Sequence, residues 1–343
     1  MTPVTPPSPA AEPSEQIRPA EGGDESTAEA SPVRQTQPTS RPKSLAVPLG
    51  LLKTMRPRQW VKNVLVLAAP FAAGRLLDLT VLPDVALAFV AFSLAASGVY
   101  LINDTKDVEA DRAHPKKKFR PIAAGIVPPT LAVVWGIVLF AAALAVSFLA
   151  DPDLLTVTAI YIAVQLAYCL WLKHEPVIDI CIVSSGFLMR AIAGGAAAGL
   201  PLSPWFLLTM AFGSLFMASG KRYAEMRLAE RTGAKIRKSL ERYSASYLRF
   251  VWSLSATVVI MAYGLWAFGI GVTAMPGRLP SAPSTWAIVS IVPFVVAILR
   301  YAVDVDGGNG GEPEEIVLGD RVLQVLGVVW VALIGLAVYT AGA

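Results

Sequence analysis

The amino-acid sequence predicts an all-α polytopic membrane protein, and two observations carry that prediction. Hydrophobic residues make up 55% of the 343 positions and charged residues only 16%, with a mean hydropathy of +0.56. A soluble domain usually carries about 25% charged residues. Apolar runs of about 17–25 residues, the length that crosses a bilayer as a helix, recur along the chain.

Nine such runs are predicted as transmembrane helices. Clusters of Pro and Gly, such as Pro128-Pro129 and Pro276-Gly277, separate most of them. The spans cover approximately residues 61–77, 83–103, 128–149, 153–172, 177–199, 204–220, 247–271, 284–302 and 322–341.

Residues 1–44 differ in composition from the rest of the chain. They are rich in Pro, Ser, Thr, Ala and Glu and contain almost no large apolar side chains. Such a segment cannot bury enough surface to offset its ordering entropy. It also lacks the basic start and apolar core of a signal peptide. We expect a disordered cytoplasmic tail over 1–44 and a nine-helix transmembrane domain over 45–343.

The basic residues indicate how the chain crosses the membrane. The net charge is +4, but its distribution over loops is typical of membrane topology and not of nucleic-acid binding. With the N-terminus inside, the outer connections hold only Arg75 and Arg278. We therefore expect a multi-pass protein of the plasma (inner) membrane. The predicted cytoplasmic connections hold Lys106, Arg112, Lys116, Lys117, Lys118, Arg120, Lys173, a dense basic group over 221–249, Arg300 and Arg321.

An acidic face lies where the second span meets a basic loop. At about 100° per residue, an amide and three carboxylates fall on one side of a helix. Carboxylates this close repel one another unless a cation neutralises them, and oxygen ligands favour Mg2+ or Mn2+. The alternative is a solvated helix end offset by Lys106 and Arg112. The four residues are Asn103, Asp104, Asp107 and Asp111.

A basic loop follows the acidic face directly. Lys117, Lys118 and Arg120 stand next to the candidate metal ligands. A diphosphate requires this combination, because the metal bridges phosphate oxygens and the side-chain cations bind the others. The alternative is ordinary positive charge on a cytoplasmic loop, and His114 is uninformative alone.

A second basic group precedes the first span. Trp60 suits the membrane interface, and the neighbouring cations suit lipid phosphates or a phosphorylated substrate. Snorkelling anchors are the alternative explanation. The polar members of this group are Arg56, Arg58, Lys62 and Asn63.

Ionisable residues also occur inside or at the end of apolar spans. Asp179 and Arg190 share one helix face but are about 16 Å apart along it, so each is expected to line a cavity or to meet another partner. Lys221 and Glu225 are one helical turn apart, which suits either a salt bridge or a second substrate-binding face. The small residues over 191–199 permit close helix packing and can support a homo-oligomer.

These motifs resemble the UbiA superfamily of intramembrane prenyltransferases over almost all of residues 50–341. The carriers are Asn103-Asp104-x-x-Asp107-x-x-x-Asp111, then Lys117 and Arg120-Pro121-Ile-Ala-Ala-Gly125. The resemblance implies nine transmembrane helices around a central cavity, with Mg2+ held by two aspartate-rich motifs on the cytoplasmic side.

The chain departs from that pattern at the second motif. Where the superfamily has Asp-x-x-x-Asp near the end of the sixth helix, this chain has Lys221-Arg-Tyr223-Ala-Glu225. The 56–66 stretch, the 114–121 loop and Gly186-Phe-Leu-Met-Arg190 instead resemble a branch that transfers 5-phosphoribosyl from phosphoribosyl pyrophosphate to decaprenyl or another polyprenyl phosphate. That branch serves arabinogalactan and lipoarabinomannan synthesis.

The resemblance implies a role for each group of residues in a Mg2+-dependent pentosyl transfer. The alternatives are a UbiA enzyme joining a prenyl diphosphate to an aromatic acceptor, and a membrane transporter. The expected metal ligands are Asn103, Asp104, Asp107 and Asp111, the three aspartates being catalytic; the donor-binding set is Lys117, Lys118, Arg120, Lys221, Tyr223, Glu225, Asp179 and Arg190; the lipid-phosphate set is Arg56, Arg58, Lys62 and Asn63.

Overall fold

The computed structural model describes residues 43–233, 240–270, 284–307 and 313–340. Within these ranges the secondary structure is helical and contains no strand. The predicted disordered tail lies almost wholly outside them. Its last two residues, Lys43 and Ser44, begin α1 (Lys43–Thr54), a helix that the hydropathy pattern does not predict. The tail therefore stays a prediction.

The predicted spans all correspond to helical segments. The first is split into a 3-10 helix, η1 (Pro57–Leu67), and the short α2 (Ala68–Ala72). The long helices are α3 (Leu82–Lys106), α5 (Pro129–Ala150), α6 (Pro152–Leu170), α7 (Ile178–Ala197), α8 (Pro204–Thr232), α9 (Ala245–Gly269), α10 (Thr285–Asp306) and α12 (Arg321–Thr340). The short connecting helices are α4 (Val108–Ala113), η2 (Lys117–Phe119), η3 (Leu172–His174) and α11 (Pro313–Gly319).

Among the described residues, 7 helices are long and apolar enough to cross a membrane: α3, α5, α6, α7, α9, α10 and α12. The first segment falls outside this set because it is broken, so the count of nine spans stays a prediction. α8 continues well beyond its predicted end at residue 220. Its last part is rich in Arg, Ala and Glu, which favour helix even where the segment is no longer apolar.

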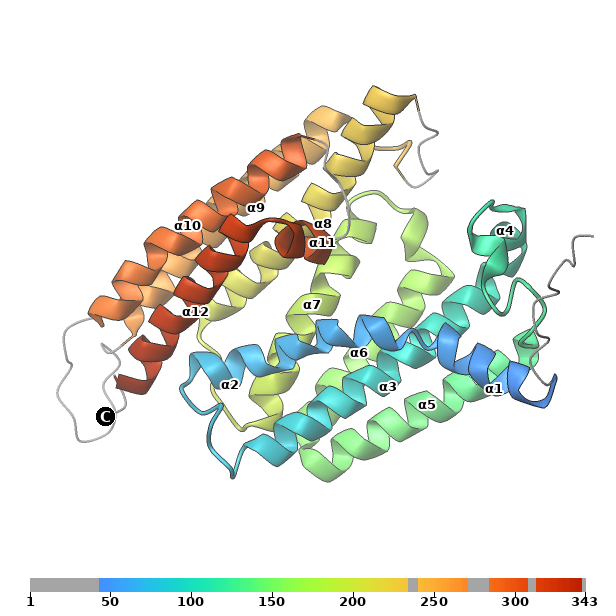
Figure 1. Cartoon of the computed structure of the whole chain (residues 1–343). Helices are drawn as coiled ribbons and strands as arrows, with labels where there is room; N and C mark the ends of the chain where they lie inside the picture. Colours follow the sequence, from blue (N-terminus) through green and yellow to red (C-terminus); the bar gives the residue numbers. More distant parts are fainter. Residues whose placement is uncertain (1–42, 234–239, 271–283, 308–312, 341–343) are drawn as a thin grey trace, which may run out of the picture. The chain divides into compact units, whose positions relative to one another are not determined.

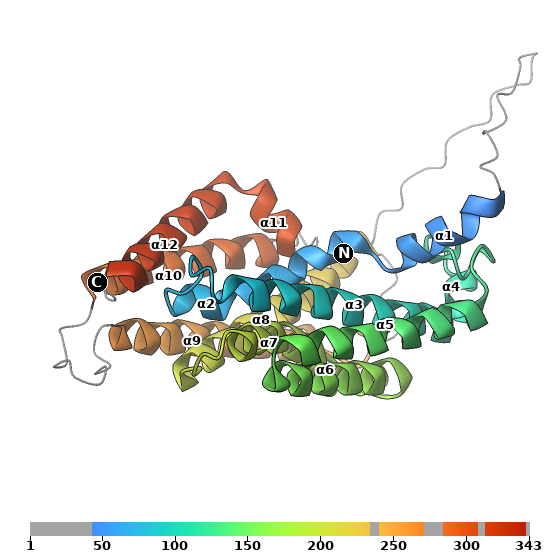
Figure 2. The same ribbon diagram turned by 90° about the horizontal axis from the view of Figure 1, so that it is seen from below.

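Successive long helices pack on one another in chain order. Contacts join α3 to α5, α5 to α6, α6 to α7, α7 to α8, α8 to α9, α9 to α10 and α10 to α12. α12 then contacts α2, so the series closes on the first segment. Figure 1 and Figure 2 both show α3 beside α5 and α10 beside α12. The most enclosed apolar window is that of α3, 61% buried against 22% in α10 and α12.

α7 contacts η1 closely because one of its residues lacks a side chain. A Cβ atom built on Gly194 would lie 1.7 Å from the carbonyl oxygen of Val66. No side chain fits such a gap, so glycine is required by packing and not by backbone conformation. The close approach fixes the split first segment against the middle of α7.

Replacing Gly194 by alanine should therefore disrupt folding. The added methyl group must push η1 and α7 apart, and we expect a large fall in the thermal unfolding temperature and loss of monodisperse protein in detergent. Gly264→Ala in α9 is the matched control. A Cβ there meets nothing within 4 Å, and alanine favours helix over glycine by about 1 kcal/mol. Equal stability of the two variants would contradict the packing argument.

Candidate active site

Two buried carboxylates converge at the end of α3. Asp104, in the last turn of α3, and Asp111, in α4, are each 2% exposed. Nη1 of Arg120 lies 3.1 Å from Oδ1 of Asp104 and 2.7 Å from Oδ2 of Asp111. One guanidinium nitrogen thus donates to both carboxylates. The two acids share one small region although they belong to different helices.

A second guanidinium reaches Asp104 from the segment that precedes η1. Nη2 of Arg56 donates to Oδ1 of Asp104 at 2.7 Å, and its guanidinium carbon lies 4.6 Å from the Tyr100 ring centroid. Arg56 has a φ of 53° and precedes a proline. This left-handed backbone is strained for a residue with a side chain, and such strain gathers at functional sites.

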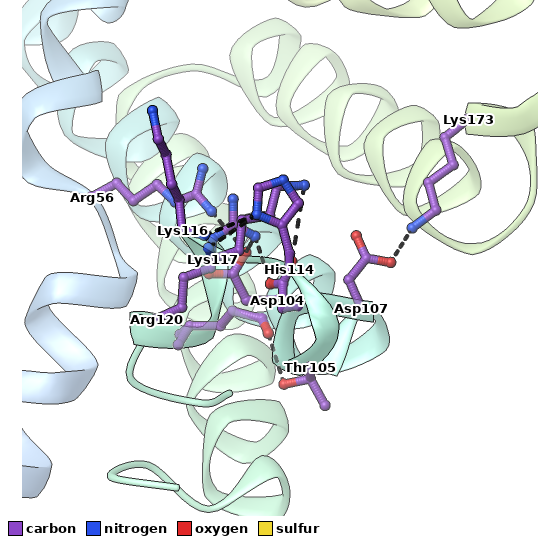
Figure 3. A network of polar contacts seen from close by, with 11 residues as sticks. Arg56, Asp104, Thr105, Asp107, His114, Lys116, Lys117, Arg120 and Lys173 are labelled. Atoms are coloured by element: carbon purple, nitrogen blue, oxygen red, sulfur yellow. Dashed lines mark hydrogen bonds and ion pairs between the residues drawn. The ribbon is translucent and has the colours of Figure 1, made fainter. Parts of the chain in front are cut away.

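Asp107 lies apart from the other two aspartates. α3 ends at Lys106 and α4 begins at Val108, so Asp107 occupies the junction between them. Its carboxylate is paired with Nζ of Lys173 from η3 (Figure 3). One helix face therefore does not hold all the predicted ligands together. In the described part of the chain, no three His, Cys, Asp or Glu side chains form a group that could hold a metal ion.

The carboxylate oxygens at this helix end nevertheless suit a magnesium–diphosphate complex. Mg2+ in proteins usually takes one or two carboxylates and completes its coordination with water and substrate phosphate oxygens. The converging oxygens of Asp104 and Asp111 meet that requirement. Asp107, about one helical turn from each along the sequence, is paired with Lys173 through Oδ1. Asn103 stands half-buried beside them at the end of α3.

The basic loop surrounds this acidic pair on one side. Nζ of Lys117 lies 3.9 Å from Oδ1 of Asp111. Nδ1 of His114 accepts the backbone N–H groups of Lys116 and Lys117 at 3.2 and 3.3 Å, which shapes the loop (Figure 3). Lys118 is exposed, and its Nζ lies 5.3 Å from the Phe119 ring centroid.

Asp179 and Arg190 have separate partners, as their spacing predicts. Asp179 is 2% exposed, and its Oδ2 lies 2.8 Å from Nη2 of Arg222. Its Oδ1 accepts the hydroxyl of Tyr243. Burial, and then this hydrogen bond, raise the pKa of the Tyr243 phenol, so it remains a protonated donor at neutral pH.

The Tyr243 oxygen also accepts the backbone N–H of Val177 at 2.6 Å. Val177 has a φ of 69° and is β-branched, which makes it a stronger backbone outlier than Arg56. It stands at the start of α7, next to the segment that carries Lys173. Arg242 holds the same segment by donating to the carbonyl of His174 at 2.7 Å.

Arg190 lies deep in α7 and bonds to the first segment. Its Nε donates to Oδ1 of Asn63 at 2.7 Å, and Nδ2 of Asn63 donates to Oγ of Ser93 at 2.9 Å. Asn63 is 0% exposed. Two members of the predicted substrate-binding sets, Arg190 and Asn63, are thus bonded to each other inside the helix bundle.

The remaining predicted residues are divided between surface and core. Arg58 is exposed, whereas Lys62 is half-buried with its Nζ 5.9 Å from the Phe187 ring centroid. Tyr223 is 3% exposed, and its hydroxyl donates to Asp306 at 2.9 Å. Lys221 and Glu225 are half-buried on α8 on either side of Tyr223.

Three residues close to the predicted groups were not predicted from the sequence as site residues. Lys173 entered only as a topology signal, although it is the one lysine of a short connection. Arg222 belongs to the altered second motif, but nothing in that motif pairs it with Asp179. Tyr243 follows a basic loop and carries no signal by type or spacing. Each of the three contacts a carboxylate that is distant from it in the sequence.

The arrangement can bind a polyanion with its own metal. Acidic oxygens converge at the end of an enclosed helix, and Arg56, Lys117 and Arg120 are all within reach of them. Cations fixed beside carboxylates stabilise negative charge that develops on a leaving diphosphate.

Comparison with known proteins places the chain in a family. Residues 64–307 match the UbiA prenyltransferase family. The chain is 60% identical over 309 residues to a decaprenyl-phosphate phosphoribosyltransferase of Mycolicibacterium smegmatis, an alignment covering 89% of this chain and 97% of that protein. It is 56% identical over 302 residues to a protein of the same name in Corynebacterium glutamicum, covering 87% and 89% of the two chains.

A solved structure shows the same fold at low sequence identity. A UbiA homolog from Archaeoglobus fulgidus bound to GPP and Mg2+ superposes with a TM-score of 0.62 and 15% identity, over 85% of this chain and 99% of that one. The sequence match, the helical fold and the acidic end of α3 lead to one conclusion: the chain belongs to the UbiA prenyltransferase family.

Proposed function

We propose that this chain transfers 5-phosphoribosyl from phosphoribosyl pyrophosphate to decaprenyl phosphate, or another polyprenyl phosphate, in a Mg2+-dependent pentosyl transfer. The products are the polyprenylphosphoryl 5-phosphoribose and pyrophosphate, for arabinogalactan and lipoarabinomannan synthesis. The observation that carries the proposal is 60% identity over 97% of a relative named for this reaction. The acidic and basic groups at the end of α3 support it, because they suit a diphosphate.

The donor's pyrophosphate is assigned to the converging acids and the basic loop. Asp104 and Asp111, with Asn103 and Asp107, would hold Mg2+, which supplies positive charge to the leaving pyrophosphate when it is bound. Arg120, Lys117 and Lys118 neutralise the remaining phosphate oxygens. Mn2+ can replace Mg2+ in such an oxygen site. As the bond from C1 of ribose to the pyrophosphate oxygen breaks, these fixed cations stabilise the leaving charge.

The lipid phosphate is assigned to the basic group at the start of η1. Its oxygen is anionic near neutral pH, so it forms the new bond to C1 without a strong general base. Position is then the larger requirement. Arg58 and Lys62 are the candidates for holding this phosphate, whereas Arg56 contacts Asp104 and belongs with the diphosphate site. Asn63 is buried, which favours a supporting role.

The donor's ribose and 5-phosphate are assigned to the altered second motif. Lys221 and Glu225 on α8 are the candidates, because Tyr223 is buried against Asp306. Arg222, which lies between these two candidates in the sequence, forms an ion pair with Asp179. Because phosphoribosyl pyrophosphate is water-soluble, we place this site and the N-terminus on the cytoplasmic face of the plasma membrane.

Two other functions are less well supported. A prenyl diphosphate held between two acidic clusters needs carboxylates at the second motif, where this chain has Lys221 and Arg222. A transporter would leave its substrate chemically unchanged, whereas the relatives that are 56–60% identical over the aligned residues are named as transferases.

The direct test uses purified full-length protein, labelled phosphoribosyl pyrophosphate and decaprenyl phosphate. We expect a labelled lipid and free pyrophosphate in equal amounts, because one phosphoribosyl group moves in each turnover. Removal of divalent cations with EDTA should abolish the product, and added Mg2+ should restore it. A labelled lipid that forms only from a prenyl diphosphate and an aromatic acceptor would overturn the assignment.

Removing single acidic charges should affect catalysis far more than folding. We expect Asp104→Asn and Asp107→Asn to reduce kcat at least about 100-fold, as loss of charge stabilisation at a metal site usually does. Glu109→Gln is the matched control, since Glu109 in α4 is 81% exposed and pairs only with Arg112 on the surface. Full activity in either aspartate variant would disprove its metal role.

Two substitutions at Arg56 test the effects of its side chain on activity and of its strained backbone on stability. Both Arg56→Gly and Arg56→Ala remove the guanidinium, and we expect each to reduce activity at least about tenfold because a charged hydrogen bond to Asp104 is lost. Glycine adopts a φ of 53° without strain, so the Gly variant should be more stable by about 1 kcal/mol. Thermal unfolding in detergent measures the difference, and equal stability would show that the backbone is unstrained.

A further inference from the structure

The first membrane segment is held in an unusual conformation. η1 is a 3-10 helix of 11 residues, whereas 3-10 runs longer than about 3–4 residues are uncommon. Three side-chain contacts hold it. Nε1 of Trp60 donates to Oγ of Ser97 at 3.1 Å, Asn63 donates to Ser93 at 2.9 Å, and Arg190 donates to Asn63 at 2.7 Å.

Arg190 is a buried cation that pairs with neutral groups only. Its side chain also donates to the carbonyl of Gly186 and, at 3.4 Å, to the hydroxyl of Tyr161. The guanidinium carbon lies 5.4 and 5.7 Å from the ring centroids of Tyr161 and Phe187. Among the ion pairs of the described residues, none joins Arg190 to a carboxylate. Placing a charge in an apolar span is costly, so a specific role is expected.

The spacing of the contacts between α7 and η1 matches the rise of a 3-10 helix. Arg190 meets Asn63, and one turn later Gly194 meets Val66. Four residues of α-helix rise about 6 Å, and three residues of 3-10 helix also rise about 6 Å. An α-helical first segment would rise only about 4.5 Å over the same three residues. The pair Arg190 and Gly194 therefore favours the 3-10 form of η1.

This conformation bears directly on the candidate active site. η1 begins immediately after Arg56, which contacts Asp104, and it carries Arg58 and Lys62. Lys62 and Arg190 also lie against the same ring, because Nζ of Lys62 is 5.9 Å and the Arg190 guanidinium carbon is 5.7 Å from the Phe187 centroid. A change in the rise of η1 would move Lys62 relative to Asp104.

We propose that Arg190 is a positioning residue for the acceptor's phosphate. Together with Gly194 it holds η1 in the 3-10 form, and this sets where Arg58 and Lys62 stand beside the acidic pair. The inference rests on the proposed function for the identity of the phosphate. It makes Arg190 a support that touches neither substrate, in place of the donor-binding role that its residue type suggests.

The kinetic test compares Arg190→Gln, Asn63→Ala and the double variant in lipid nanodiscs. We expect each to raise the KM for polyprenyl phosphate about tenfold, equivalent to about 1.4 kcal/mol. The KM for phosphoribosyl pyrophosphate and kcat should change less than about twofold. The KM of the double variant for polyprenyl phosphate should be no higher than that of either single variant, because both substitutions break the same Arg190–Asn63 contact. Arg190→Lys keeps a donor for Asn63 and should recover most of the lipid affinity.

Arg75→Gln is the matched control, because Arg75 lies just beyond α2 and forms a surface ion pair with Asp78. It should leave both KM values unchanged. The proposal is overturned if Arg190→Gln raises the KM for phosphoribosyl pyrophosphate instead, which would mark a donor-binding residue. It is also overturned if the KM for the lipid is unaffected.

A second measurement does not depend on turnover. Amide hydrogen exchange over residues 57–67 should be faster in Arg190→Gln and in Asn63→Ala, with exchange in α9 unchanged. If the wild-type protein transfers no phosphoribosyl group, the proposed function fails. The exchange measurement then still tests whether Arg190 and Asn63 stabilise η1. Unchanged exchange in both variants would overturn the positioning role. Should Arg190→Gln fail to fold, Asn63→Ala and Arg190→Lys provide the same comparison.

Discussion

The neutralisation of buried charge at the end of α3 is the interaction on which the rest of the site depends. Asp104 and Asp111 are almost fully buried, and an isolated carboxylate in such a place would lose its hydration without compensation. Arg120 meets both, and Arg56 meets Asp104. The basic loop and the segment before η1 are therefore drawn to the same helix end. The cations that satisfy these acids are the ones that suit a diphosphate.

The sequence predicts this fold well because helices that cross a membrane are apolar whether they face lipid or protein. The apolar window of α12 has a mean hydropathy of 2.3, although only 22% of it is buried. The apolar runs correspond to helices, and the acidic motif stands at the end of α3. Contacts between distant segments are less predictable. Spacing excludes a direct pair of Asp179 with Arg190, but it does not reveal Arg222 or Asn63 as their partners. Those pairs depend on which helix faces meet, and residue type alone does not report this.

Backbone strain marks two places where side chains must be aimed. Arg56 and Val177 are the non-glycine residues with positive φ in the described part of the chain. The first precedes η1 and contacts Asp104. The second immediately precedes α7 and lies two residues before Asp179 in the sequence. Each stands immediately before a helical segment, η1 or α7. No sequence pattern signals this strain, because β-branched and basic residues rarely adopt such a conformation.

The dependence of η1 on α7 also has a consequence for how the chain is made. Asn63 and Arg190 are separated by 127 residues, and a ribosome adds that many in about 6–25 s. Until then the first segment has neither the cation that bonds Asn63 nor the glycine that leaves room for the Val66 carbonyl. Polar groups without partners are poorly tolerated in lipid. The first membrane segment thus gains these contacts only after the fifth predicted span, α7, has been synthesised.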